Sequence, residues 1–356
     1  MKKKLAVLTV AASVVASFPV SLMAAEPAGA PQEVQVIPLT QNSSGAKVNE
    51  VVAKARAAGE EGLQKRAAAA KTERSAASAD TASKSAVNYL LIEGNTHYLY
   101  EKNGVDEAEK VYVYESEAPA AASEARAKGA VAAAAVNLPD GIGGKAVVTK
   151  NGSYFNATVR TATAAQLTGA PSGATYIYGG FSGTGRKYDG TSTSYPVEAD
   201  MGLQYSNSYG YVKWTPMLSF YNGVKSNGSF QSGYDKVQYK NGYKGGVDLN
   251  LTTYRNVNGN TRLSVSGTAE CPDMACTSQT DTYLTSVVEV AGTNVSSVSK
   301  WKMLATIAGS ETVTGKNYAQ FKNVNVDGVT QTPTVEAEDY ATVSISGSTA
   351  TINVSR

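Results

Sequence analysis

Residues 195–205, YPVEADMGLQY, alternate between apolar and polar side chains, and residues 211–221, YVKWTPMLSFY, follow the same pattern. A period of two residues is typical of a β-strand with one buried and one solvent-facing side. The short polar connection between the two runs predicts an antiparallel hairpin. In such a hairpin the apolar faces pair with each other, and so do the polar faces.

The rest of the chain from residue 145 onward repeats this kind of pattern. Strand-type runs recur with Gly, Asn, Asp and Ser between them, and no segment has a helical period. We therefore predict that residues 138–356 form an all-β domain, a two-sheet antiparallel β-sandwich of the jelly-roll or lectin type. A closed barrel is the structural alternative. Asn151-Gly152, between two such runs, predicts a two-residue hairpin turn.

Three segments of different composition precede the predicted sandwich. Residues 1–25 combine Lys2 to Lys4 with an apolar run and small residues at 24 and 25, which predicts a secretory signal peptide. Residues 26–87 form an alanine-rich leader, helical or disordered, because large apolar residues are few there. Residues 88–137 predict a small β-meander followed by an alanine-rich linker.

The predicted signal peptide makes a secreted, extracellular protein the expected product. Disulfides persist in that environment, so we expect Cys271 and Cys276 to be bridged. A metal site there would need more soft ligands than the sequence offers nearby. The formal net charge is only +2 and no long basic block occurs, so we expect no nucleic-acid partner. No later apolar run is long enough to span a membrane, so we expect no membrane contact after signal cleavage.

The polar face of the predicted hairpin is the candidate ligand surface. Carboxylates and amides can hydrogen-bond to sugar hydroxyls, and aromatic rings can cover apolar sugar faces. The alternative is a solvated outer face in which Asp200 and Lys213 form a cross-strand ion pair. The candidate ligand-binding residues are Glu198, Asp200, Gln204, Tyr211 and Lys213.

Other chemistry has weaker support in the sequence. Glu198-Ala199-Asp200 resembles the start of the strand motif of laminarinase-like glycosidases, but Gln204 lies where a second acid would be needed. His97 is the sole histidine, which excludes a Ser-His-Asp triad or a His-rich zinc site in the β-domain. We therefore predict no catalytic residues, no cofactor and no metal site, except that oxygen ligands at Asp189-Gly190 or Asp248-x-Asn250 leave a structural calcium ion open.

Several of these strands also resemble a known family. The segments YIYGGFSG (176–183), EADMGLQY (198–205) and Trp214-Thr-Pro, with the strands of residues 246–268, are similar to the YrpD-like family of secreted proteins from spore-forming bacteria. The resemblance covers about residues 140–356. It implies a secreted protein of unassigned function.

These observations favour a secreted, non-enzymatic β-sandwich protein that binds a polysaccharide, a cell-wall glycan or another cell-envelope surface. Two alternatives remain open at this stage. One is a polysaccharide-active hydrolase or lyase whose acid and base come from scattered carboxylates and tyrosines. The other is a structural exoprotein of the wall or of a biofilm.

Overall fold

Two β-sheets and a long helix make up the part of the chain that the computed structural model describes. This part comprises residues 34–40, 44–72, 85–104, 107–115, 141–167, 174–206, 213–227, 241–273, 276, 282–309 and 312–356, all within one unit, Val34–Arg356. The predicted signal peptide, the alanine-rich linker and Tyr211 lie outside the described residues. The helical segments are η1 (Gly45–Lys47), α1 (Val48–Thr72) and η4 (Ala164–Leu167).

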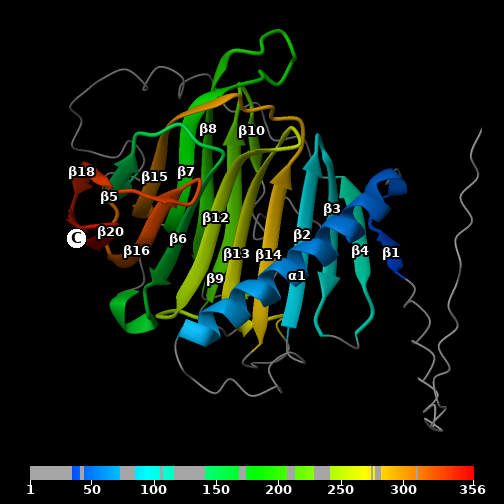
Figure 1. Cartoon of the computed structure of the whole chain (residues 1–356), viewed down its shortest axis with the longest axis horizontal. Helices are drawn as coiled ribbons and strands as arrows, with labels where there is room; N and C mark the ends of the chain where they lie inside the picture. The colour runs from blue at the N-terminus through cyan, green and yellow to red at the C-terminus, as the bar shows by residue number, and fades with distance from the viewer. Residues whose placement is uncertain are drawn as a thin grey trace, which may run out of the picture. The chain divides into compact units, whose positions relative to one another are not determined.

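The larger sheet, which we call sheet A, lies nearer the viewer in Figure 1. It is antiparallel except where β1 pairs with β4 and β2 pairs with β14. In spatial order its strands are β1 (Gln35–Pro38), β4 (Lys110–Glu115), β3 (Thr96–Lys102), β2 (Ser85–Glu93), β14 (Tyr283–Val290), β13 (Asn260–Cys271), β12 (Asp248–Val257), β6 (Tyr154–Thr161), β16 (Lys316–Val326), β20 (Thr349–Ser355) and β19 (Ala341–Ser346), with β17 (Val329–Thr330) paired to β16.

The second sheet, sheet B, lies behind sheet A in this view and carries the predicted hairpin. Two short strands flank the outer edge of β9, and one of them, β11, also pairs with β13 and so links the two sheets. In spatial order sheet B contains β18 (Thr334–Asp339), β5 (Gly141–Val148), β15 (Ser297–Ala308), β7 (Ala174–Gly185), β8 (Tyr195–Ser206) and β9 (Lys213–Tyr221), with β10 (Lys225–Asn227) and β11 (Gly242–Tyr243) beyond β9.

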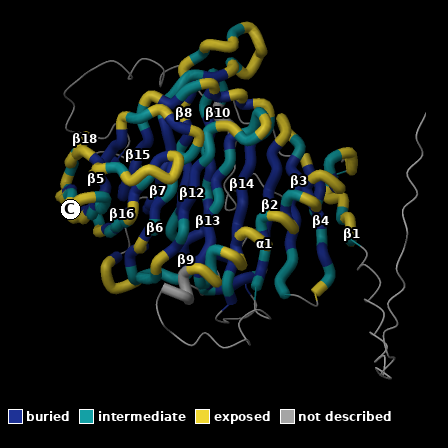
Figure 2. The backbone as a smooth tube through the Cα atoms, in the orientation of Figure 1, coloured by how far each residue is buried: buried dark blue, intermediate teal, exposed yellow. Residues whose placement is uncertain are grey.

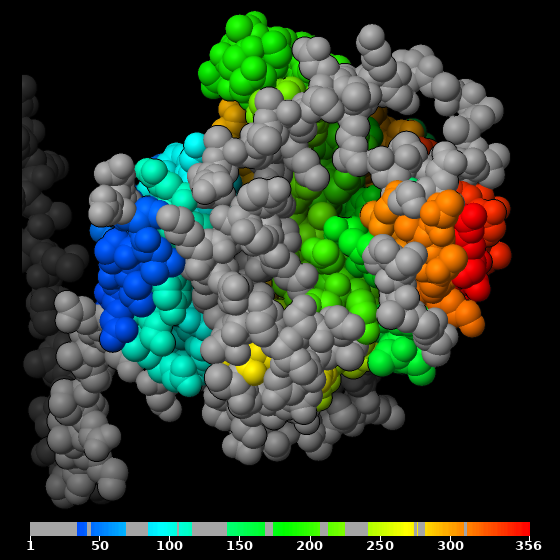
Figure 3. Space-filling model, turned by 180° about the vertical axis from the view of Figure 1, so that it is seen from behind, coloured from blue at the N-terminus to red at the C-terminus, as the bar shows by residue number. Residues whose placement is uncertain are grey.

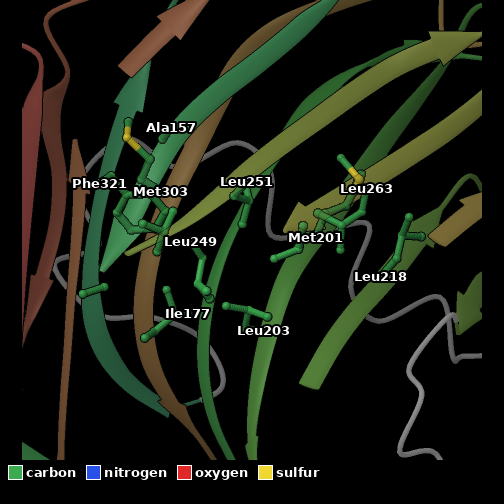
Figure 4. Packing of buried hydrophobic residues seen from close by; sticks show 14 of the residues in the cluster. Ala157, Ile177, Met201, Leu203, Leu218, Leu249, Leu251, Leu263, Met303 and Phe321 are labelled. Atoms are coloured by element: carbon green, nitrogen blue, oxygen red, sulfur yellow. The ribbon is translucent and has the colours of Figure 1, made fainter. Parts of the chain in front are cut away.

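The apolar faces of the two sheets pack against each other and form the main core. Alternating residues from most strands of both sheets meet there, so each of these strands buries one side (Figure 4). Figure 2 shows the same pattern as dark blue segments along the strand centres. Burial of so many apolar side chains is the principal favourable contribution to folding. Core residues labelled in Figure 4 are Ala157, Ile177, Met201, Leu203, Leu218, Leu249, Leu251, Leu263, Met303 and Phe321.

The predicted fold class is confirmed: the chain is all-β, with two packed sheets preceded by a helical leader segment. The two parallel pairings depart from the expected antiparallel arrangement. The hairpin predicted at Asn151-Gly152 is wrong, because β5 lies in sheet B and β6 in sheet A. The turn instead passes between the sheets, where the Asn151 side chain accepts from the backbone N–H of Val298 and Asp327 accepts from the N–H groups of Ser153 and Tyr154.

The predicted meander is present as β2, β3 and β4, but it continues sheet A. Strand β2 pairs in parallel with all eight residues of β14, so the sheet runs across the boundary expected near residue 138. Alternate side chains of this meander point to opposite faces of sheet A. Those on one face belong to the main core, and those on the other face pack beneath α1.

Helix α1 packs on the outer face of sheet A over β14, β2 and β3 (Figure 1). Its contact stripe consists of small residues, among them Val51, Ala55, Gly59 and Gly62. A Cβ at Gly59 would lie 2.8 Å from Val87 Cγ2, so the helix backbone approaches the sheet closely. Although large apolar residues are few in this helix, its small residues let it cover the large side chains of the sheet.

A buried ion cluster fastens α1 to the sheet. The Glu289 side chain is fully buried and bonds to Lys54 of the helix and to Arg262 of β13, each at 2.7 Å. Tyr89 donates to the same carboxylate at 2.6 Å. Burial alone would raise the pKa of Glu289, but the Arg262 charge and the hydrogen bonds from Lys54, Tyr89 and Asn260 outweigh it and hold the pKa below its usual value.

Candidate functional site

Strands β8 and β9 form the predicted hairpin, with the predicted faces. Met201 pairs with Leu218 on the core side, while Asp200 pairs with Ser219 and Gln204 with Thr215 on the other side. The core-side residues are almost fully buried. The polar residues of the hairpin therefore lie on the outer face of sheet B, which turns away from sheet A. Part of the green surface that includes β7 to β9 is visible from behind in Figure 3.

A lysine from another strand holds the two carboxylates of β8. The Lys302 ammonium donates to Glu198 Oε1 at 2.6 Å and to Asp200 Oδ1 at 2.7 Å. The lysine side chain is only 3% exposed, whereas the side chains of Glu198 and Asp200 are 54% and 38% exposed. The ammonium thus lies beneath two carboxylates that still face solvent. We call Glu198, Asp200 and Lys302 the acidic triad.

The acidic triad depends on a glycine between its strands. Lys302 of β15 pairs with Gly180 of β7, which in turn pairs with Asp200 of β8. Two strand spacings of about 4.8 Å separate β15 from β8, so the lysine has to lie across β7. Gly180 has no side chain in its path. Its φ of 146° also suits glycine, and a Cβ there would lie 2.1 Å from the Ala199 carbonyl oxygen.

The charges of the triad make it a hydrogen-bond acceptor site. Burial lowers the pKa of Lys302, but the charges of Asp200 and Glu198 outweigh it and raise the pKa above its usual value. The ammonium therefore stays protonated at neutral pH and both carboxylates accept from it. A retaining glycosidase needs one of its two carboxyl groups to donate a proton. The geometry of the triad favours binding of donor groups over acid catalysis.

Two tyrosines lie beside the carboxylates on the same face. Tyr176 pairs with Gln204, and Tyr178 pairs with Gly202, which has no side chain to cover the ring. Their ring centroids are 6.3 Å apart, with the rings nearly perpendicular. Burial raises the pKa of Tyr176, so its phenol remains protonated. The face therefore offers aromatic surface and hydroxyl groups next to an amide and two carboxylates.

The structure separates some of the predicted site residues from the others. Lys213 is completely buried at the far end of the hairpin, opposite Ser206. The Asp200–Lys213 ion pair considered from the sequence is wrong, because the register places Ser219 opposite Asp200 and because Lys302 binds Asp200. Glu198, Asp200 and Gln204 share one strand face. Tyr211 lies outside the described residues.

Sequence reasoning missed Lys302 and Gly180. Lys302 alternates with buried Trp301 and Met303, which marks it as an outward-facing residue of its strand. Its contact with Asp200, 102 residues earlier, depends on the order of three strands. No local pattern predicts that order.

The oxygen ligands considered for calcium are engaged by other groups. Asp189 accepts from the backbone N–H and hydroxyl of Thr191 and pairs with Lys187 at 2.7 Å. Asp248 pairs with Lys322 at 2.5 Å and with Arg160 at 3.5 Å. Within the described ranges, no three His, Cys, Asp or Glu side chains gather as a metal site would require.

The predicted disulfide is present. Cys271 and Cys276 are bridged, and Cys271, the last residue of β13, is fully buried. Next to it, the Asn241 side chain donates to the Pro272 carbonyl at 3.1 Å and to Asn88 Oδ1 at 2.7 Å. The bridge therefore closes a short loop at a well-packed strand end.

The fold and the site define a two-sheet all-β protein with an ion-paired polar outer face. A family model described as a domain of unknown function, YrpD, matches residues 135–354. The chain belongs to the YrpD family. A curated relative, an uncharacterized protein YrpD of Bacillus subtilis (strain 168), is 33% identical over 227 residues, which are 63% of this chain and 85% of the relative.

Solved structures show only a distant likeness. A crystal structure of Scytalido-glutamic peptidase with a peptide-based transition state analog matches 62% of this chain and 100% of that one, at 10% identity and a TM-score of 0.38. SCP-B, a member of the Eqolisin family of peptidases in complex with a tripeptide, has a TM-score of 0.35. These TM-scores are too low to support any inference. Among the described residues, no helix is both long and apolar enough to cross a membrane.

Proposed function

We propose that this chain is a secreted, non-enzymatic protein that binds a glycan of the cell envelope through the outer face of sheet B. The observation that carries the proposal is the acidic triad, in which a buried ammonium fixes two partly exposed carboxylates. Acceptors that are held in place before binding lose little conformational entropy when a ligand arrives. Sugar hydroxyls are donors that suit such acceptors.

The neighbouring residues support a sugar ligand further. Tyr176 and Tyr178 provide ring surface beside Gln204, which combines a donor and an acceptor in one amide. Aromatic surface with a few placed polar groups is the usual composition of a small-molecule site. The hydrolase alternative lacks support here, because both carboxylates accept from the same ammonium. The secreted location rests on the predicted signal peptide.

The first prediction concerns Asp200. Asp200→Asn keeps an oxygen acceptor for Lys302 but removes the carboxylate charge, so we expect binding to weaken about tenfold, which corresponds to the ~1.5 kcal/mol of a charged hydrogen bond. Retention of the mature protein on a panel of immobilised polysaccharides measures the effect, together with a reducing-end assay for released sugar. The thermal midpoint should also fall, because the buried Lys302 ammonium loses one of its carboxylate partners, so retention is measured well below the midpoint of each variant.

The matched control is Asp248→Asn. Asp248 is a similarly exposed, ion-paired aspartate, but it lies on the outer face of sheet A. Its replacement should leave retention unchanged. Equal losses for both variants, or no retention of the wild type by any polysaccharide, would reject the glycan-binding proposal. Release of reducing ends that Asp200→Asn abolishes would favour the hydrolase.

A further inference from the structure

An uncharged polar cluster lies on the outer face of sheet A. Asn156 of β6 accepts from Asn325 Nδ2 of β16 at 3.3 Å. Its own Nδ2 donates to Thr252 Oγ1 at 2.7 Å and to Asn250 Oδ1 at 3.1 Å, both on β12. All four side chains extend from the outer side of their strands, because a neighbour of each along its strand belongs to the main core. We call Asn156, Asn250, Thr252 and Asn325 the amide cluster.

Hydrogen bonds within the amide cluster fix the orientation of two groups at its ends. Asn325 uses its Nδ2 to reach Asn156 Oδ1 and the Asn323 carbonyl, so its own Oδ1 is left as an acceptor. Asn250 Oδ1 accepts from Asn156 and Thr252, so its Nδ2 is left as a donor. Neither Asn325 Oδ1 nor Asn250 Nδ2 has a partner within the described ranges, and both residues are partly exposed. The cluster therefore presents one acceptor and one donor in fixed positions.

Two tyrosines adjoin the amide cluster on the same side of β6 and β12. Tyr154 and Tyr254 are opposite each other in the register, two residues beyond Asn156 and Thr252, or about 7 Å along the strands. Their ring centroids are 5.7 Å apart. A Cβ at Gly328 would lie 3.4 Å from the Tyr154 hydroxyl oxygen, so this side chain extends toward the turn after β16. Both tyrosines are partly exposed and offer aromatic surface beside the fixed donor and acceptor.

Helix α1 leaves this part of sheet A open. The helix packs over β14, β2 and β3, and the middle of β12 and β6 lies beside it in Figure 1. Burial, and to a lesser degree the charge of Glu61 on α1, raises the pKa of Tyr254, so its phenol stays protonated. The amide cluster and the two tyrosines contain no charged side chain, in contrast to the acidic triad. Uncharged donors, acceptors and rings suit the hydroxyl groups and apolar faces of sugars.

We infer that the amide cluster, together with Tyr154 and Tyr254, is a second binding site for the same glycan, so that one molecule joins two glycan chains. This inference rests on the proposed function and adds a cross-linking role to it. The two sheets pack through their apolar faces, so their outer faces point in opposite directions. The sheets themselves are about 10 Å apart, so an extended chain that lies on sheet B does not reach the amide cluster. Two bound chains are therefore held on opposite sides of one molecule.

The test is a capture assay with two polysaccharides, solubilised peptidoglycan strands and neutral hydroxyethyl cellulose. Each polymer is immobilised, the protein is added, and a fluorescent sample of the same polymer follows. A protein with one site is retained but captures no second chain. We expect wild-type protein that is retained on either polymer to capture the labelled polymer at roughly tenfold the level measured without protein. Light scattering identifies self-association, because a dimer of one-site molecules would also capture a second chain.

Variants of the second site should reduce capture more than retention. Tyr154→Ala should lower capture about tenfold, as expected for loss of an aromatic anchor, whereas Tyr154→Phe keeps the ring and should capture like the wild type. Asn325→Ala removes the fixed acceptor and should lower capture about fivefold. Retention falls less in these variants, because the acidic triad is intact. Asp200→Asn should lower capture as well, since capture requires both sites.

The matched control for Asn325→Ala is Gln320→Ala. Gln320 is an amide of the same strand, but it donates to Thr351 and lies outside the amide cluster. The control for Tyr154→Ala is Tyr340→Ala, which removes an exposed tyrosine between β18 and β19. Neither control should change capture. Circular dichroism and thermal midpoints establish that each variant is folded.

The outcomes separate the second site from the proposed function. Asp248→Asn remains a control, because Lys322 and Arg160 hold its carboxylate and because Asp248 lies beyond Asn250 on the side away from the tyrosines. If the wild type is retained but captures no second chain, or if Tyr154→Ala captures as well as the wild type, the second site is overturned and the proposed function survives. If neither polymer retains the wild type, both fail together.

Discussion

Lys302 is the residue on which the geometry of the site depends most. Moving an ammonium out of water costs several kcal/mol, and only its pairing with carboxylates offsets that cost. Glu198 and Asp200 hold the lysine and remain partly exposed themselves. The lysine reaches them across Gly180, where the side-chain layer of β7 is open. The absence of a side chain at Gly180 is therefore as important to the geometry of the acidic triad as its three charged side chains.

The prediction at this scale is that Gly180→Ala destabilises the fold and disturbs the acidic triad. Its φ of 146° is unfavourable for alanine, and the new Cβ would lie 2.1 Å from a carbonyl oxygen. We expect a loss of about 1–3 kcal/mol in the free energy of unfolding, measured by urea denaturation. The neighbouring Gly179→Ala is the control, since its Cβ would have ordinary contacts of 3.4 Å or more. Similar losses for the two variants would refute the argument.

Alternation along a strand predicts which side chains share a face, and it does so correctly for Glu198, Asp200 and Gln204. It contains no information about partners on strands distant in sequence. The pairing of Lys302 with Asp200 follows from the order β15, β7, β8, which depends on how the whole sheet assembles. For the same reason the sequence paired Lys213 with the wrong residue, because the register of the hairpin was not known.

At the level of elements, α1 shows how a helix with few large apolar residues can still dock. Its small residues allow close approach, and the burial comes from side chains of the sheet, such as Tyr89 and Tyr100. Composition left a helical and a disordered leader both open here, and it did not predict the contact with the sheet, because the usual criterion for docking is the width of the apolar stripe. At Gly59 and Gly62 the helix backbone lies so close to the sheet that no large side chain is needed to fill the space between them. The ion cluster at Glu289 then fixes the position of the helix.

We predict that Gly62→Val displaces the C-terminal half of α1 from the sheet. A Cβ at this position would lie 2.1 Å from the Thr285 hydroxyl oxygen, so the helix or the strand must shift. Overpacking of this kind costs about 1–3 kcal/mol. Hydrogen exchange of α1 amides should accelerate, and the thermal midpoint should fall. Ala57→Val, on the exposed side of the same helix, introduces the same β-branched residue without the clash. Its exchange should resemble that of the wild type.

At the level of the whole molecule, sheet A contains strands from two parts of the chain. One part is matched by the family model, and the other part precedes the match. The match begins at residue 135, whereas β1 to β4 and α1 come before it. Only about 40 residues of the curated relative lie outside the matched region, too few for a segment of this length. The change in composition near residue 138 lies close to the start of this match. It did not indicate that β2 extends the sheet beside β14, because that pairing joins segments roughly 200 residues apart.

This arrangement predicts the behaviour of a chain that starts at residue 135. Removal of β2 leaves eight residues of β14 without their parallel partners, and Val287 loses the cover of α1. An exposed sheet edge with apolar neighbours promotes association between copies. We therefore expect the shortened chain to unfold at a lower temperature and to self-associate with increasing concentration, as measured by light scattering. A chain that starts at residue 34 should remain as stable as the full chain. Val287→Lys in the shortened chain should restore a monomer, because charge on an edge strand opposes pairing. A shortened chain that is monomeric and fully stable without this substitution would show that the first part of the chain contributes little to sheet A.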